Sequence, residues 1–505
     1  MRKHFALLAT VCLLCALEFL QAGMIAFGAV PIRGEIEASP EEYSLVAALY
    51  ACIAVVVIAQ QRWLIERLGW RSYTLGSLGV YIVGALVCSL SGHLWSFAVG
   101  RVVMGIGGGA FMTMARTMVN LMPPGPERFS GIKVFAAGLA GGTAAAPLIA
   151  SLAVTHDNWQ AIFWVLILIA GLAGLLSLSF LPSQPPSQAV RSQTGVARIL
   201  LLATGSFFLL YTLQRSYYDF YNDTSILLIF GVLAAIAVYV FFHVEHRHER
   251  PLLRIRDLTT PRYLSGVALF SFCYLVVGAN SYMIPIYLQS GLGYAWETIG
   301  RFQALGLAAS LLTWVVMARM LPQHSAPKKF FVAGFLALAG FGWQLASLSP
   351  DAEMWWDILP PLALNGCFVM LVLATAAMQT FADVGREETL FSHAQQVKTM
   401  LGQLALAMGT SLATVFLQWR STVQYGSLNV RLVPGDPALS DHLQRLSGYF
   451  AASHDASQSS QMAWASLGQQ LARQSTLLAS IEYFWIVGWI ALLALAVSAS
   501  QRVFR

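Results

Sequence analysis

Fourteen predominantly apolar stretches, most of them about 20 residues long, recur along this chain of 505 residues. An α-helix rises about 1.5 Å per residue, so about 20 apolar residues match the roughly 30 Å hydrocarbon core of a bilayer. The stretches lack the alternating pattern of barrel strands, and a helix satisfies its own backbone hydrogen bonds in lipid. The pattern predicts an all-α polytopic membrane protein with fourteen transmembrane helices. These lie near residues 5–31, 43–61, 73–92, 94–119, 132–154, 159–181, 198–214, 224–243, 263–289, 298–318, 328–348, 355–380, 394–418 and 478–500.

The composition excludes the other broad classes of protein. Hydrophobic residues make up 57% of the chain and charged residues 11%, whereas a soluble domain carries about 25% charged residues and a disordered chain is poor in apolar ones. All six cysteines lie inside apolar stretches, so we expect buried thiols rather than a disulfide framework. The first stretch continues past Glu18 to about Ile32 without an A-x-A cleavage site, so we expect it to be retained.

The positions of lysine and arginine predict an orientation. With a cytoplasmic N-terminus, 22 of the 30 fall in cytoplasmic segments, seven fall outside, and Arg101 lies within a span. Four of the seven share one long loop, where the positive-inside rule has less force. Topology thus explains the net charge of +6 without nucleic-acid binding. We predict cytoplasmic N- and C-termini in a multi-pass protein of a bacterial-type inner membrane.

Two segments are too polar to lie in a bilayer. Residues 182–195 (PSQPPSQAVRSQTG) have the composition of a linker, so 182–197 is predicted to be a cytoplasmic linker. Residues 419–476 are expected to form a long extracytoplasmic loop, whose later part, about 457–478, could fold as a surface amphipathic helix. A catalytic domain is not expected there, because the loop contains no cluster of candidate ligands.

A charged segment, 62–71 (RWLIERLGWR), joins the second and third spans and contains Glu66, Arg67, Gly69 and Arg71. A carboxylate beside arginines at a helix end can latch neighbouring helices through charge-assisted hydrogen bonds. The simpler alternative is a basic loop that merely obeys the topology rule.

Arg101 lies inside the fourth span and is followed by a run of glycines that includes Gly105. An arginine within the membrane is costly and normally faces a cavity or a partner, while glycines let another backbone approach closely. The fifth span carries Gly142 and Pro147, which suit tight packing and a bend at the proline. A purely structural role is the simpler alternative in both spans.

These motifs resemble, in order and spacing, the signatures of the major facilitator superfamily. Segment 62–71 is similar to the cytoplasmic pattern Gly-x-Leu-Ala-Asp-Arg-x-Gly-Arg-Lys, and the segment from Arg101 is similar to Arg-x-x-Gln-Gly-x-Gly. The fifth span resembles a weakened antiporter motif. The resemblance implies a role in conformational gating for Glu66, Arg67, Gly69, Arg71, Gly105, Gly142 and Pro147.

The later segments 242–253, 285–294 and 398–403, together with the count of spans, resemble the fourteen-helix drug:proton antiporter branch (EmrB/QacA type). This resemblance implies two pseudo-symmetric six-helix halves and two inserted helices. The halves would be residues 1–181 and 251–505, and the inserted pair would be 198–250.

Glu18 is the clearest acidic residue inside a span, and the sequence contains no Gly-x-x-x-x-Gly-Lys-Ser/Thr loop for ATP. Uphill transport would then need an ion gradient and an intramembrane titratable group. Helix rise places Glu18 about 18 Å and Arg101 about 21 Å from the inner surface. We predict that the two form or exchange an ion pair controlled by protonation; alternatively, Glu18 only neutralises Arg101. The branch usually has an Asp where this chain has Ala22, and Glu18 lies one turn away.

Aromatic, methionine and amide side chains on the spans are candidates to line a central cavity, since they suit amphipathic organic substrates. Helix packing is the simpler role for any single one. The candidates are Gln21, Met24, Asn280, Tyr282, Tyr287, Asn365 and Met370.

His243, Glu245, His246, His248 and Glu249 form a cluster that a zinc site would require, because histidine and carboxylate are zinc ligands. The cluster lies in the most basic cytoplasmic segment and overlaps a pattern typical of the branch. We therefore predict no metal and no cofactor.

The predicted function is that of a secondary active transporter, not an enzyme. It would export amphipathic, drug-like organic compounds in exchange for protons by alternating access. The expected partners are a small-molecule substrate, protons and the lipid bilayer, with a periplasmic adaptor protein as a further candidate and no nucleic acid. One alternative is export of a specific metabolite or siderophore-like anion, favoured by Arg101 and the missing Asp. Another is a membrane-embedded sensor or enzyme, which should cluster Asp, His or Glu at a membrane face.

Overall fold

A computed structural model describes residues 2–123, 125–181, 192–216, 223–320, 326–349, 351–384, 387–432, 436–451, 455–501 and 503–504. Across these ranges every regular element is helical, which confirms the predicted all-α class. The α-helices are α1 Arg2–Phe27, α2 Ala29–Glu35, α3 Pro40–Ser89, α4 Leu94–Gly108, α5 Phe111–Met118, α6 Pro126–Thr155, α7 Ala161–Ser177, α8 Val196–Arg215, α9 Thr224–Arg247, α10 Pro261–Ile286, α11 Trp296–Met320, α12 Pro327–Ala346, α13 Leu359–Thr380, α14 Glu388–Val430, α15 Pro437–Phe450 and α16 Ala456–Ser500. Short turns of 3-10 helix (Val119–Leu121, Ile255–Leu258) and π-helix (Tyr287–Gly291, Met354–Ile358) flank some of them.

Within the described residues, twelve helices are long and apolar enough to cross a membrane. One of them, α3, has 50 residues and is broken at Gly69, whose φ of 78° and ψ of 163° only glycine adopts readily. Both arms of α3 pack on α4. A methyl group added at Gly109 would lie 2.5 Å from Cα of Ala54 on the first arm, and one at Gly107 would meet the backbone of Tyr81 on the second. The chain therefore reverses at Gly69. The apolar helix α7 is shorter than the twelve, at 17 residues.

The structure differs from the predicted spans at three places. The first expected span, 5–31, is divided at Gly28 into α1 and α2, and the fourth, 94–119, is divided after its glycine run into α4 and α5. Residues 419–476 are mainly helical rather than a loop: α14 continues to Val430, α15 follows, and α16 begins at Ala456 and runs unbroken into the last apolar stretch. Hydropathy locates where apolar character ends, whereas these helices continue with polar residues.

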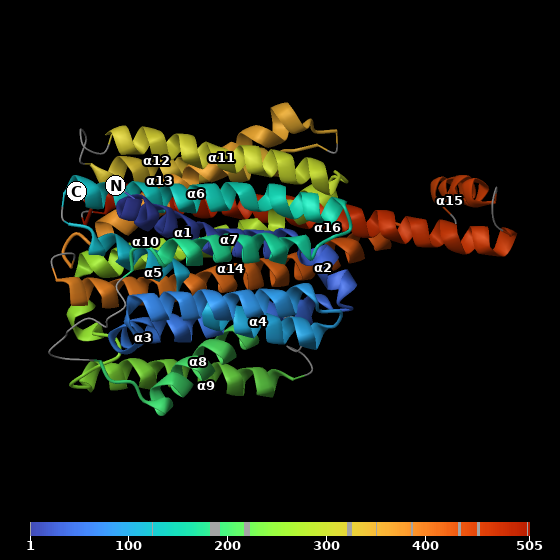
Figure 1. Ribbon diagram of the computed structural model, residues 1–505. Coiled ribbons are helices and arrows are strands. Elements are labelled where there is room, and N and C mark those ends of the chain that lie inside the picture. The colour runs from blue at the N-terminus through green and yellow to red at the C-terminus, as the bar shows by residue number, and fades with distance from the viewer. Residues whose placement is uncertain are drawn as a thin grey trace.

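The helices form an elongated bundle with both chain termini at the same end, called here the termini end (Figure 1). Helix α15 and the first part of α16 project beyond the opposite end (Figure 1). Helices α8 and α9 lie at the periphery of the bundle. In the most apolar stretch of each, only 28% of the α8 residues and 22% of the α9 residues are buried. Helix α8 packs on α3, from the N-terminal part of the chain, and on α14, from the C-terminal part.

Glycines allow two close helix crossings at the centre of the bundle. Methyl groups added at Gly138 and Gly142 of α6 would lie 2.5 Å and 2.7 Å from the carbonyl oxygens of Cys12 and Ala16 on α1. On the other crossing, a methyl group at Gly409 of α14 would meet the carbonyl oxygen of Leu275 on α10. Lipid tails are as apolar as the helix surfaces, so the hydrophobic effect does not drive helices together inside the membrane. Close van der Waals contacts such as these therefore contribute much of the packing energy.

We expect Gly409→Val to destabilise the protein, because the added side chain would overlap the backbone of α10. Overpacking of this kind costs about 1–3 kcal/mol or more. Thermal unfolding in detergent, followed by intrinsic fluorescence, should show a lower Tm. Gly426→Val is the matched control, because it lies on the same helix with nothing within 4 Å of the added carbon. Equal Tm values for the two variants would contradict the assignment of this crossing.

Candidate functional site

A central cavity of about 950 Å³ lies between α1, α3, α8, α10 and α14. Its lining includes Arg33 and Pro40, which flank the connection between α2 and α3, so this compartment lies toward the end opposite the termini (Figure 1). Small residues such as Ala22, Ala47 and Ala51 make the space. The polar groups of the lining are Gln21, Arg33, Tyr43, Ser44, Tyr50, Arg101, Gln214, Tyr282, Gln403, Thr410, Ser411 and Thr414.

A second compartment of about 750 Å³ lies on the other side of α1, against α6, α10 and α11. It is lined by Glu18, Thr143, Pro147 and Gln303 among others. The two compartments share residues of α1 and α14, including Ala22, Gln403 and Thr410. The line along which α1 meets α14 therefore separates two parts of one central cavity.

Glu18 lines the second compartment, is bonded to Gln403, which lines both, and is only 4% exposed. Its Oε1 accepts a hydrogen bond of 2.6 Å from Nε2 of Gln403. Its Oε2 has no hydrogen-bond partner among the described residues. A buried carboxylate with one free oxygen beside a cavity is placed to bind a proton or a donor group of a ligand.

Arg101 lines the first compartment and is also 4% exposed. Its Nη1 donates to Oε1 of Gln21 at 3.1 Å, and its guanidinium carbon lies 4.3 Å from the centre of the Tyr50 ring. In the part of the chain that the structure describes, Arg101 has an amide rather than a carboxylate as its partner. The predicted pairing of Glu18 with Arg101 is therefore not formed in this conformation, and exchange between them stays a prediction.

The predicted lining residues divide into two groups. Gln21 and Tyr282 line the first compartment, and Met370 lines a separate pocket beside α13. Met24, Asn280, Tyr287 and Asn365 are not among the residues that line either central compartment, and a role for them in contact with substrate stays a prediction. Asn280 hydrogen-bonds Asn365 at 3.1 Å, and the Tyr287 hydroxyl donates to the carbonyl of Leu345 at 2.9 Å. Met24 is fully buried in the apolar core.

A polar stripe along α14 was missed by the sequence analysis. Gln396, Gln403 and Thr410 are spaced by seven residues, which places them on one face of the helix. Gln403 binds Glu18, while Thr410 and neighbouring polar groups line the cavity. From α8, Gln214 is 7% exposed and donates to the carbonyl of Ser44 at 2.9 Å and to Oγ of Ser411 at 3.0 Å. The seven-residue spacing of these polar residues is the sequence pattern from which the stripe could have been predicted.

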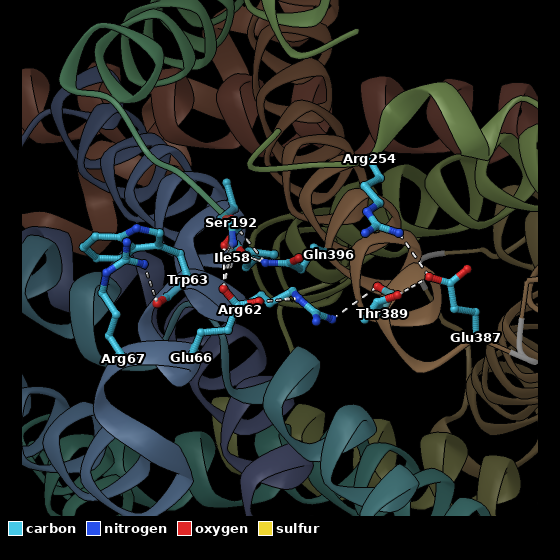
Figure 2. A network of polar contacts seen from close by, with 11 residues as sticks. Ile58, Arg62, Trp63, Glu66, Arg67, Ser192, Arg254, Glu387, Thr389 and Gln396 are labelled. Atoms are coloured by element: carbon cyan, nitrogen blue, oxygen red, sulfur yellow. Dashed lines mark hydrogen bonds and ion pairs between the residues drawn. The ribbon is translucent and has the colours of Figure 1, made fainter. Parts of the chain in front are cut away.

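A polar network joins α3 to α14 (Figure 2), near the end of the bundle where both termini lie (Figure 1). Arg62 donates to Oε1 of Glu66 at 2.8 Å and to the carbonyl of Thr389 at 3.3 Å. The second oxygen of Glu66 accepts from the backbone N and Oγ of Ser192 at 3.0 and 2.9 Å. Gln396 of α14 donates to the carbonyl of Ile58 at 2.7 Å. We call these contacts the inner latch.

The other predicted gating residues lie around or away from the inner latch. Arg67 stacks on Trp63 at 4.2 Å, apart from the α14 contacts (Figure 2). Gly69 makes the reversal of α3, and Arg71, which follows it, is half-buried. Gly105 packs against Ile53, Gly142 against Ala16, and Pro147 lines the second compartment. Their roles in gating stay predictions.

Glu245, in the histidine-rich segment at the end of α9, has a structural role. Within the described residues no group of three or more His, Cys, Asp or Glu side chains is arranged to hold a metal ion. Glu245 is 1% exposed and instead pairs with Nη1 of Arg198 at 2.9 Å and accepts from the backbone of Leu253 at 3.0 Å. The carboxylate thus ties α8, α9 and the segment before α10 together.

A helical bundle that spans a membrane, encloses a polar-lined central cavity and is closed by contacts at one end has the architecture of a membrane transporter. The family model described as "Major Facilitator Superfamily" matches residues 11–410. The chain belongs to the Major Facilitator Superfamily, as its motifs predicted.

Relatives and solved structures agree with this assignment. "Uncharacterized MFS-type transporter YhcA" of Bacillus subtilis is 23% identical over 77% of this chain and 72% of its own length. "Putative multidrug resistance protein MdtD" of Salmonella typhi is 25% identical over 75% of this chain and 79% of its own.

Among structures, the human organic anion transporter MFSD10 aligns with a TM-score of 0.57 at 14% identity, over 98% and 99% of the two chains. An inward-facing bacterial homologue of the human lysosomal transporter Spinster aligns with a TM-score of 0.57 at 17% identity, over 100% of this chain and 98% of the other. These structures share the fold with this chain.

Proposed function

We propose that this transporter exports amphipathic organic compounds in exchange for protons. The observation that carries the proposal is Glu18, a buried carboxylate that lines the second cavity compartment, with one oxygen held by Gln403, which lines both compartments, and the other free. Such a group can take up a proton in one conformation and release it in another, which couples a proton gradient to transport. The name of the MdtD relative, a multidrug resistance protein, supports an organic substrate.

The proposed topology has fourteen crossings with both termini in the cytoplasm of a bacterial cell and the protein in its inner membrane. The twelve long helices, the second arm of α3 and the shorter α7 support this number. The shared end of the two termini (Figure 1) and the distribution of lysine and arginine support the orientation.

We also propose the predicted domain division. Residues 1–181 and 251–505 would form the two halves, with 198–250 as the inserted pair. The linker 182–197 would join them, although residues 182–191 lie outside the described ranges.

Alternating access would occur by rocking of the two halves about the cavity. The inner latch closes the termini end while the larger compartment lies toward the opposite end, so this conformation corresponds to an outward-facing state in the proposed cycle. Opening of the latch would admit substrate from the cytoplasm. A periplasmic adaptor is a candidate partner for the projecting α15 and α16.

Everted membrane vesicles that contain the full chain test this function. We expect a pH jump to drive accumulation of amphipathic dyes, from a panel that includes cationic and anionic members, and a protonophore to collapse it. Vesicles without the protein give the background. If no dye of the panel accumulates above that background in a gradient-dependent way, proton-driven export is refuted.

A further inference from the structure

Lys398 lies deep in the bundle on α14 and is 1% exposed. Its ammonium nitrogen lies 4.2 Å from the centre of the Phe270 ring and 4.9 Å from that of Phe381. In the part of the chain that the structure describes, no carboxylate pairs with it. Aromatic rings stabilise a buried cation only in part, and their contacts are weaker than the cost of burying an unpaired charge.

Arg116 of α5 presents a second cation in the same region. Its guanidinium lies 4.9 Å from the centre of the Phe391 ring, and its buried Nη1 has no hydrogen-bond partner among the described residues. Arg116 also lines a small cavity, together with Phe270 and Met370. Phe270 therefore contacts Lys398 while it lines the cavity to which Arg116 belongs.

The position along α14 places these cations on the inner side of the proton site. Phe391, Lys398 and Gln403 follow one another at about 10 Å and about 7 Å along the helix axis. Since Gln403 binds Glu18, Lys398 lies between the inner latch and Glu18. Helix α14 also supplies Thr389 and Gln396 to the latch, so opening the latch would expose Lys398 and Arg116 to the side from which export begins.

The buried cations of the described bundle outnumber the buried carboxylates that are free to pair with them. The other buried acids of the described chain are committed, Glu66 to Arg62 and Glu245 to Arg198. Glu18 is then the one remaining buried carboxylate among the described residues, and it is hydrogen-bonded to Gln403 rather than to Arg116 or Lys398. A cation entering this inner region would meet like charge, whereas an anion would supply the missing counter-charge.

We propose that Lys398 and Arg116 bind an acidic group of the exported compound, and that the surrounding phenylalanines hold its apolar part. The substrate class is then amphipathic organic anions that carry a carboxylate, sulfonate or phosphate. This assignment rests on the export function proposed above and names its substrate class.

Two dyes with the same xanthene ring system and opposite charge test the substrate class: fluorescein, an anion, and tetramethylrhodamine methyl ester, a cation. Fluorescence anisotropy with the purified full chain in detergent should show at least tenfold tighter binding of fluorescein. Lys398→Met should weaken fluorescein binding about tenfold or more and should also raise the Tm, because it removes an unpaired buried charge. Replacing a residue with a purely structural role would lower the Tm, whereas here weaker fluorescein binding is expected together with a higher Tm.

Lys398→Arg should retain the preference for the anion, and Lys329→Met, which removes an exposed lysine, should change neither quantity. Equal or tighter binding of the cationic dye, or unchanged fluorescein binding by Lys398→Met, would overturn the proposal. In everted vesicles, gradient-driven accumulation of the cation alone would refute the anion site and leave export standing. Lys398-dependent binding without gradient-driven flux of any dye would instead refute export.

Discussion

Replacing Glu18 with Gln is expected to reduce pH-driven dye accumulation in everted vesicles to the background of protein-free vesicles. The amide cannot bind and release a proton, but its Oε1 can still accept the hydrogen bond that Gln403 donates to Glu18. The cavity should therefore keep its shape and lose its coupling. Exchange of labelled for unlabelled dye across the membrane, which needs no net proton movement, should continue.

The comparison of driven accumulation with exchange separates a coupling defect from a folding defect. Glu35→Gln is the matched control, because Glu35 is an exposed acid on α2, and it should leave both activities unchanged. If Glu18→Gln accumulates dye normally after a pH jump, the coupling proton binds elsewhere. If it loses exchange as well, Glu18 holds the substrate or the helix packing rather than the proton.

Replacing Glu66 with Ala is expected to open the termini end of the cavity. Glu66 receives hydrogen bonds from Arg62 and from two groups of Ser192, and it is 2% exposed. Breaking a buried ion pair by removal of one partner costs about 3–5 kcal/mol. This cost falls on the latched conformation, because there Arg62 stays buried without its carboxylate, whereas water can reach it once this end opens. A shift of about 1.4 kcal/mol changes the ratio of two conformations tenfold, so the open state should gain at least tenfold in population.

Maleimide labelling of Cys15 measures this change, because its thiol is fully buried in the latched structure. In a variant that keeps Cys15 and lacks the other five cysteines, Glu66→Ala should raise the labelling rate about tenfold from the side of the termini. Glu388→Ala is the control, since Glu388 is an exposed acid at the same end of the bundle. An unchanged labelling rate in Glu66→Ala would mean that the polar network does not hold this end closed.

The helical class and the superfamily could be predicted because they depend on features that are local in sequence. Apolar length predicts membrane helices whatever their neighbours are, and the motif around Glu66 marks a reversal between two spans. The hydrogen-bond partner of Glu18 could not be predicted, because Gln403 is 385 residues from Glu18 in sequence.

The rotation of each helix about its own axis, which decides the side chains that face the cavity, could not be predicted from the sequence. Asn280 and Tyr282 are two residues apart, which on a helix of about 3.6 residues per turn turns their side chains roughly 200° from each other. Tyr282 consequently lines the cavity, while Asn280 lies in the packing between helices, bonded to Asn365 and Tyr483. Composition of a span cannot separate these two directions when both faces are buried by protein.

The unbroken course of α16 has a mechanical consequence. A helix of 45 residues is about 68 Å long, and its C-terminal part is packed on α12 and α14 inside the bundle. Helix α15 is packed on its distant part. Arg473 already bonds the carbonyl of Gly291 in the bundle, so about 25 Å of α16 lies beyond it, and a tilt of about ten degrees would move the far tip by about 4 Å. In the proposed cycle, α16 would therefore act as a lever that carries the rocking of the two halves to its projecting end and to α15.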